Sequence, residues 1–236
     1  MKNFTFPLKQ PQILEALSKL ECLQTYKLVK SRKWFYKKEG FLKKTIELKL
    51  LYKTRPAYIN ELYIKVSPIL DVRFSFLHDW LEEFVNLHIS FYREMNTWGI
   101  AFESNYIFDS YDLTLRINDL SSFEEDLKKF ENWIKNYALP YLETHSKLSY
   151  VYHQEIIPLL KDLDKYYCNG IKYFEILAIV KIVAPDKLPE SMNIIRAHME
   201  MLNSSGDPNV EDYLPIFDKI IQKLEGMEFK EAEGYI

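Results

Sequence analysis

The chain is poor in glycine, in cysteine and in long apolar runs. Of its 236 residues only 6 are glycine and 2 are cysteine. Loops that hold phosphate groups need glycine, because the backbone must approach the ligand closely. No GxGxxG, Walker or GxSxG pattern occurs anywhere. These absences argue against a nucleotide-dependent enzyme with a local signature, and the sequence predicts no cofactor.

Cysteine spacing and hydropathy give further exclusions. Cys22 and Cys168 lie 146 positions apart and neither belongs to a CxxC pair, so we expect two reduced thiols and no zinc site. No window approaches the ~20 apolar residues of a membrane span, and the start of the chain, MKNFTFPLKQ, lacks the apolar core of a signal peptide. The sequence therefore predicts a cytoplasmic protein with no membrane partner and no bound metal.

Charge is distributed unevenly along the chain. Residues 1–60 carry 14 Lys or Arg against 4 Glu, whereas the remainder carries 17 basic and 30 acidic residues. Such a chain either pairs its two parts internally or presents opposite electrostatic fields to its partners.

The hydrophobic period predicts a sheet in the first part of the chain. After a helical pattern from Pro11 to about Lys30, apolar and polar residues alternate, as in antiparallel strands with one buried face. The alternating segments are KTIELKLLYK, ELYIKVS, DVRFSF, WGIAFE and YDLTLRI, with RKWFYKKEG as a further candidate. The pattern predicts an α+β fold in which an antiparallel sheet of about five to six strands packs against helices.

Helical patterns predominate later in the chain. SSFEEDLKKFENWIKNYALP has an apolar stripe at helical spacing, and we expect Ser121 or Ser122 to cap it and Pro140 to end it. After about residue 150 the alternation stops, and the segments 153–167, 171–183, 189–203 and 211–225 have helical patterns. The sequence thus predicts an α+β domain over residues 1–150 and a helical part over residues 151–236 packed on it.

The stretch FLHDWLEEFVNLH, residues 76–88, holds two histidines among three carboxylates. On a helix, His78 and Glu82 lie on the polar side, whereas His88 falls on the apolar side. A catalytic zinc helix presents two histidines on one face at i,i+4, and a spacing of ten residues does not. The pattern predicts a helix that docks through its apolar face.

A basic, aromatic segment runs from Lys27 to Lys44. Cations interleaved with aromatic rings are what phosphate neutralisation and base stacking require. Lysine is also the usual residue of an exposed strand face or a protected sheet edge, and the low arginine content disfavours nucleic acid. The candidate anion-binding surface consists of Lys30, Arg32, Lys33, Trp34, Lys37 and Lys38.

An acidic, aromatic segment lies between Glu103 and Asp126. Acidic groups steer association with a basic protein, and aromatic side chains anchor the complex. The same composition also suits a helix N-terminus preceded by a solvated hairpin. The candidate protein-interaction surface consists of Tyr106, Asp109, Tyr111, Asp112 and Asp119.

The order of the elements resembles that of a known group of proteins. Alternating strands contain VRFSFLHDWLEEF, DLSSFEEDLKKFENWIKNYALPYL follows, and further helices complete the chain. Over roughly residues 10–150 this resembles uncharacterised bacterial α+β domain-of-unknown-function proteins, some of which are thought to be immunity proteins encoded beside polymorphic toxins. The resemblance implies a cytoplasmic binding protein and carries over no functional residue.

Three functions remain open at this point. The favoured one is a non-enzymatic module that binds another protein, because no local catalytic motif occurs. The second is an enzyme whose site assembles from distant residues. The third is a nucleic-acid binder that acts through Lys27–Lys44, whose affinity would fall steeply with salt.

Overall fold

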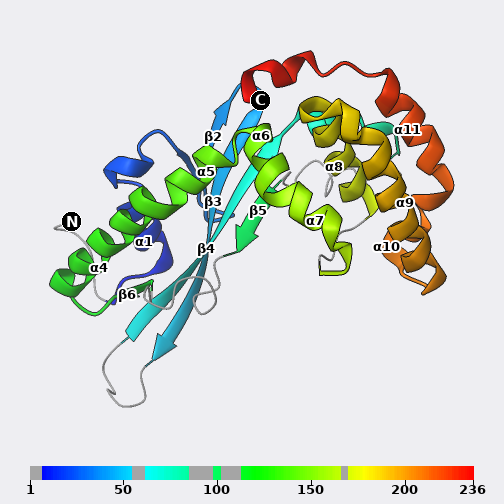
Figure 1. The fold of residues 1–236 in the computed structure, drawn as a ribbon. Helices are drawn as coiled ribbons and strands as arrows, with labels where there is room; N and C mark the ends of the chain where they lie inside the picture. The colour runs from blue at the N-terminus through cyan, green and yellow to red at the C-terminus, as the bar shows by residue number, and fades with distance from the viewer. Residues whose placement is uncertain (1–6, 55–61, 85–97, 102–112, 166–169) are drawn as a thin grey trace. The chain divides into compact units, whose positions relative to one another are not determined.

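The structure is a computed structural model that describes residues 7–54, 62–84, 98–101, 113–165 and 170–236 (Figure 1). Its contacts form two compact units. Unit 1 comprises Met1–Arg73 and Trp98–Glu143, and unit 2 comprises Phe74–Thr97 and Thr144–Ile236. Unit 2 is therefore discontinuous in the chain, because the segment after the fourth strand groups with the C-terminal helices.

Unit 1 is built on an antiparallel sheet. Its strands are β1 (Lys27–Val29), β2 (Trp34–Glu39), β3 (Leu42–Thr54), β4 (Leu62–Phe74), β5 (Trp98–Ala101) and β6 (Thr114–Arg116). They follow the order β1-β2-β3-β4-β5, and β6 also pairs with β4. The predicted α+β fold with five to six strands is confirmed.

A tight hairpin fixes the register of β2 against β3. Glu39 pairs with Leu42, so Gly40 and Phe41 form a two-residue loop. Gly40 has a φ of 60° and Phe41 keeps a negative φ, which is the pattern of a type II′ turn with glycine first. The register that follows decides which side chains share a face of the sheet.

β4 runs through Pro68 as one strand, where the sequence indicated two. The N–H of Val66 donates to the carbonyl of Leu113 at 2.8 Å, and two residues later the nitrogen of Pro68 faces the same side. On that side β6 pairs with Tyr63–Lys65 and β5 pairs with Ile69–Val72. Pro68 lies between the two partners, so its missing N–H costs no ladder hydrogen bond.

Helices cover one face of this sheet. In Figure 1, α1 (Gln10–Leu17) and α4 (Leu120–Trp133) lie together on one side of the strands. The core between them is formed by Ile13, Leu17, Phe35, Ile46, Leu48, Ile64, Val66, Phe123, Leu127 and Phe130. The prediction of a helix as far as Lys30 is wrong: η1 (Glu21–Leu23) and β1 follow α1, because Leu28 pairs with Phe35 in the sheet.

The helix that begins as α4 continues through Pro140, so the prediction that this proline ends it is wrong. The π-helical segment η3 (Ile134–Ala138) precedes the proline, and α5 (Leu139–Thr144) contains it. A proline lacks an N–H and clashes with the carbonyl four residues earlier. A wider π turn removes that demand, and a second one, η4 (Tyr152–Ile156), likewise precedes Pro158.

Unit 2 is helical, as predicted for the chain after residue 150. Its remaining elements are α2 (Phe76–Asp79), η2 (Glu82–Phe84), α6 (Leu148–Val151), α7 (Ile157–Lys161), η5 (Leu163–Lys165), α8 (Gly170–Val183), η6 (Pro185–Lys187), α9 (Leu188–Ser204), α10 (Pro208–Glu211), η7 (Leu214–Ile216), α11 (Phe217–Gly226) and η8 (Lys230–Tyr235). α8 is buried on all sides and contacts α2, α6 and α9. Among the described helices, none combines the length and apolarity needed to cross a bilayer.

The helix predicted over residues 76–88 is shorter than expected. α2 ends at Asp79, and after Trp80 the chain tightens into η2. Leu77, Trp80 and Phe84 are buried as the pattern predicted, but His78 is only 1% exposed rather than on a polar face. The reason is tertiary, because α2 packs on α8 and a buried carboxylate there receives the imidazole. His88 lies outside the described residues.

Candidate interaction surface

The side of β1–β3 that faces away from the core carries most of the basic segment. Phe35 points into the core, so its neighbours Trp34 and Tyr36 point to the opposite side, where both are half-buried. We call this side the outer face of β1–β3. Its members are Lys27, Val29, Trp34, Tyr36, Lys38, Lys43, Thr45, Glu47, Lys49 and Leu51.

Cations hold the two aromatic rings of the outer face. The guanidinium carbon of Arg32 lies 4.8 Å from the centroid of the Trp34 ring, and Lys43 Nζ lies 4.7 Å from the same centroid. Lys43 Nζ also lies 5.7 Å from the ring of Tyr36. Each such contact contributes about 0.5–1 kcal/mol at an exposed site, so the rings and cations form one ordered surface.

The hairpin places lysines directly opposite one another on both faces. On the inner face Lys37 pairs in register with Lys44. Glu39 lies 2.6 Å from Lys37 Nζ and 3.2 Å from Lys44 Nζ, and Glu143 lies 2.6 Å from Lys44 Nζ. The hydrogen bond from Lys37, and that from Lys44, hold the pKa of Glu39 below its ordinary value. The inner pair is thus neutralised by local acids.

On the outer face, Lys38 receives no such compensation from the described residues. Lys38 lies in register with Lys43, an arrangement of like charges that destabilises a sheet. Lys38 makes no ion pair with any residue that the structure describes, and the same holds for the exposed Lys27 and Lys49. Glu47, beside Trp34, is the one acid on the described part of this face. Counted over the described residues, the outer face therefore carries more positive than negative charge around its two aromatic rings.

The residues predicted to bind an anion divide between three places. Lys30, Arg32 and Lys33 form the turn between β1 and β2, while Trp34 and Lys38 lie on the outer face. Lys37 lies on the inner face, paired with Glu39 as described above. The predicted segment Lys27–Lys44 contains Lys27 and Lys43, but the six residues named as the surface did not include them, and Lys49 lies outside the segment. Counting alternate residues across the Gly40 turn would have identified Lys43.

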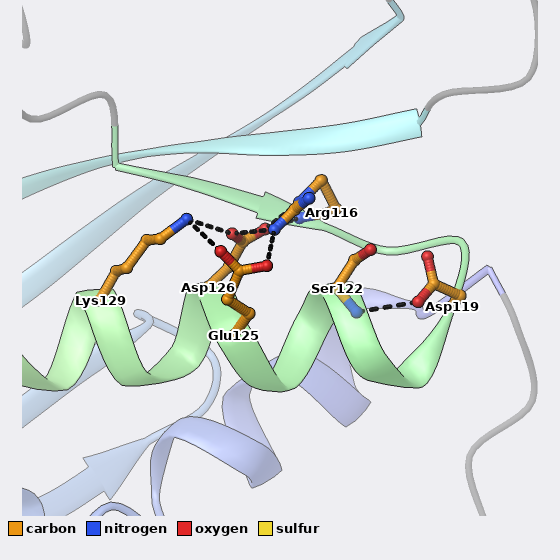
Figure 2. Close-up of polar contacts among 6 residues, drawn as sticks. All are labelled: Arg116, Asp119, Ser122, Glu125, Asp126 and Lys129. Atoms are coloured by element: carbon orange, nitrogen blue, oxygen red, sulfur yellow. Dashed lines mark hydrogen bonds and ion pairs between the residues drawn. The ribbon is translucent and has the colours of Figure 1, made fainter.

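Of the residues predicted to form an acidic surface, Tyr106, Asp109, Tyr111 and Asp112 lie outside the described residues. Asp119 is the N-cap of α4, where its Oδ1 accepts a hydrogen bond of 2.8 Å from the Ser122 N–H (Figure 2). The expected cap at Ser121 or Ser122 is therefore wrong. That hydrogen bond lowers the pKa of the Asp119 carboxyl.

Other acids near the start of α4 are engaged by Arg116. Its Nη2 lies 2.8 Å from Asp126 Oδ1 and its Nε lies 2.9 Å from Asp126 Oδ2, while Glu125 Oε2 accepts at 2.9 Å (Figure 2). Lys129 pairs with Glu125 at 2.7 Å. Hydrogen bonds to Asp126, and then to Glu125, raise the pKa of Arg116. These contacts tie β6 to α4 and leave the acids largely neutralised.

Unit 2 contains a buried cluster of charged groups. Glu175 on α8 is 1% exposed, and its Oε1 and Oε2 lie 2.8 Å from His78 Nδ1 and from Lys172 Nζ respectively. The His78 approach is close but is not aligned as a hydrogen bond. Burial raises the pKa of Glu175, but Lys172 and His78 together outweigh burial and bring it below its ordinary value. The cluster is an ionised carboxylate held by its neighbours.

A second histidine of unit 2 is also buried. His145 is 3% exposed, and its Nε2 lies 3.1 Å from Glu155 Oε1. Its Nδ1 lies 3.3 Å from the hydroxyl of Thr144, and the ring of Tyr150 packs against it edge-on at 5.0 Å. Here too the polar groups contact one another, which is the arrangement of a structural histidine.

The described residues include few side chains arranged to act as a nucleophile or to bind a metal ion. Burial raises the pKa of the Cys22 thiol to about 11, so almost no thiolate exists at neutral pH. Cys168 lies outside the described residues. Within the part of the chain that the structure describes, no group of three or more His, Cys, Asp or Glu side chains could hold a metal ion.

Comparisons with protein-family models, with curated proteins and with solved structures find no match to this chain. The resemblance to bacterial immunity-like proteins accordingly stays a prediction.

Proposed function

We propose that the protein is a non-enzymatic module that binds another protein through the outer face of β1–β3. The observation that carries the proposal is a set of exposed lysines around Trp34 and Tyr36 that form no ion pair with any described residue: Lys27, Lys38 and Lys49. Tryptophan and tyrosine anchor many protein interfaces, and charged groups at the rim steer association. The partner surface is expected to be acidic.

The buried charges support a binding protein over an enzyme. A catalytic acid or base needs an atom that can reach the substrate and a pKa matched to its task. Glu175 is instead enclosed by Lys172 and His78, and His145 is enclosed by Glu155 and Thr144. In both clusters the polar groups contact one another, as they do in clusters that stabilise a fold.

Nucleic acid is the less favoured ligand of the same surface. Bases stack on open aromatic faces, but the ring of Trp34 already has Arg32 and Lys43 over it. Most cations of the face are lysines, which make no bidentate contact with phosphate. The net charge of −3 also repels a polyanion at long range.

The site of action that we propose is the cytoplasm of a bacterium, with an immunity-type role as the specific form of the hypothesis. In that role the bound protein is a toxin, and co-production of this chain would protect cells from it. Cys22 makes no disulfide, which suits a reducing compartment.

The test is affinity purification of the tagged full chain from its native cells. We expect one stoichiometric protein, retained when Lys147 is replaced by Glu and lost when Lys27 and Lys38 are both replaced by Glu. Lys147 is an exposed lysine at the start of α6, where an acidic side chain is favourable, so it is a control for a Lys→Glu replacement away from the outer face. Equal recovery with the double variant would refute the assignment of the binding surface. Nuclease-sensitive nucleic acid in place of a protein would refute the function.

A further inference from the structure

We infer that the outer face of β1–β3 binds a short, extended, acidic segment of the partner, with acids at alternate positions. The inference rests on the proposed function and specifies the chemistry of the partner. Three properties of the face carry it: its size, the spacing of its side chains and the lack of an acid partner for Lys38 among the described residues.

The face is small for an interface between two folded surfaces. Three strands about 4.8 Å apart and six residues at about 3.3 Å per residue give a footprint of about 14 by 20 Å, or roughly 300 Å². A stable interface buries roughly 800 Å² on each partner, so this patch alone does not support a second copy of the chain. A peptide of about six extended residues also spans about 20 Å, which matches the length of β2.

The side chains repeat at the period of an extended peptide. Trp34, Tyr36 and Lys38 are successive outward residues of β2, so neighbouring members of this row are about 7 Å apart. Across the strands Lys27 lies beside Tyr36 and Lys43 lies beside Lys38. An extended segment presents every second side chain to one face at the same spacing. Acids at alternate positions would therefore meet Lys27 beside one row and Lys38 in the next.

The ion-pair geometry of the hairpin indicates carboxylates as the complementary groups. On the inner face, two carboxylates neutralise the opposed pair Lys37 and Lys44. On the outer face Lys38 opposes Lys43 and has no acid partner among the described residues. A partner carboxylate placed beside Lys38 would supply the same compensation that Glu39 supplies on the other side.

Replacing Lys38 by Glu tests this inference without endangering the fold. The new Glu would face Lys43 directly across the strands, and opposite charges in such a pair are favourable. We therefore expect the urea midpoint of the variant to equal or exceed that of the original chain. A loss of binding in this variant then reports on the surface itself. Lys147→Glu, with the same change in net charge, is again the control.

The experiment measures fluorescence anisotropy of labelled probes with the full chain. The probes are a peptide of about ten residues that alternates Glu and Ser, a peptide of equal composition with its Glu residues in one block, and oligo-dT of similar length. We expect the alternating peptide to bind best and to lose about tenfold in affinity with Lys38→Glu, against less than twofold with Lys147→Glu. Its affinity should also fall several-fold between about 50 and 200 mM salt.

Three results would overturn the inference: tighter binding of oligo-dT, equal binding of the alternating and block peptides, or no effect of Lys38→Glu. Failure of the inference differs from failure of the proposed function. A captured protein that depends on Lys27 and Lys38 but is not displaced by the alternating peptide would refute only the acidic segment. Capture that is indifferent to both lysines would refute the surface as a whole.

Discussion

Replacement of Glu175 by glutamine tests how much the buried charged cluster of unit 2 contributes to the stability of the fold. Glutamine keeps the shape of the side chain, so no cavity forms, but it removes the anion from between His78 and Lys172. Breaking a buried ion pair by removing one partner costs about 3–5 kcal/mol. The Lys172 side chain is 17% exposed and regains some hydration, so we expect the free energy of unfolding to fall by about 2–3 kcal/mol at neutral pH.

The loss of stability in Glu175→Gln should depend on pH in one direction. The pKa of Glu175 in the folded chain lies below its ordinary value of 4.5, because Lys172 and His78 outweigh the effect of burial. A group whose pKa is lowered by folding adds stability above its unfolded pKa, and that contribution is lost as the pH falls through the folded pKa. The difference between Glu175→Gln and the original chain should therefore be constant near pH 7 and shrink below about pH 4.5.

Urea unfolding followed by far-ultraviolet circular dichroism measures the effect, since unit 2 is largely helical. The control is Glu190→Gln, which removes an exposed carboxylate 3.6 Å from Lys187 and should change stability by less than about 0.5 kcal/mol. A loss as small as that for Glu175→Gln, or a loss that is equal at pH 7 and at acidic pH, would refute the reasoning.

The other predictions concern single positions in unit 1. Lys33 has a φ of 56°, so Lys33→Gly should raise the urea midpoint through about 1 kcal/mol of relieved backbone strain, whereas Lys33→Ala should leave it unchanged. Asp119→Ala should lower the midpoint because α4 loses its cap, and Asp119→Asn, which can still cap, should not; equal losses in both variants would mean that the charge matters rather than the cap. In a Cys168→Ser background, Cys22 should react with a thiol reagent about 100-fold more slowly than a thiol of pKa 9.0, because burial raises its pKa to about 11; a rate like that of a free thiol would contradict the burial.

Local sequence patterns were sufficient to predict most strands of the sheet. Alternation predicted β3, β5 and β6 as strands and left β2 as a further candidate, because a strand with one buried face needs an apolar residue at every second position. The same alternation failed at Pro68, where it indicated a break. Whether a proline interrupts a strand depends on what lies beside its nitrogen, and that is set by where β5 and β6 pair.

The candidate surface was predicted only in part. The composition of residues 27–44 identified a basic, aromatic segment, and the period of two separates Trp34 from Phe35. The sequence did not show that the acids of the inner face neutralise both Lys37 and Lys44, because Glu143, which pairs with Lys44, lies 99 positions from it in the chain. Nor did it show Arg32 and Lys43 over the same ring.

The sequence by itself determined the α+β class, the strands with one polar face and the helices after residue 150, since periodicity reports burial within a single element. Only the tertiary structure decided which polar groups are buried and which groups they contact. His78 was indicated on a polar face and is buried, because α8 brings Glu175 to it. Lys44 obtains a counter-charge from α5, whereas no described residue supplies one to Lys38. Pairings between elements depend on contacts across long stretches of chain, and no local pattern encodes them.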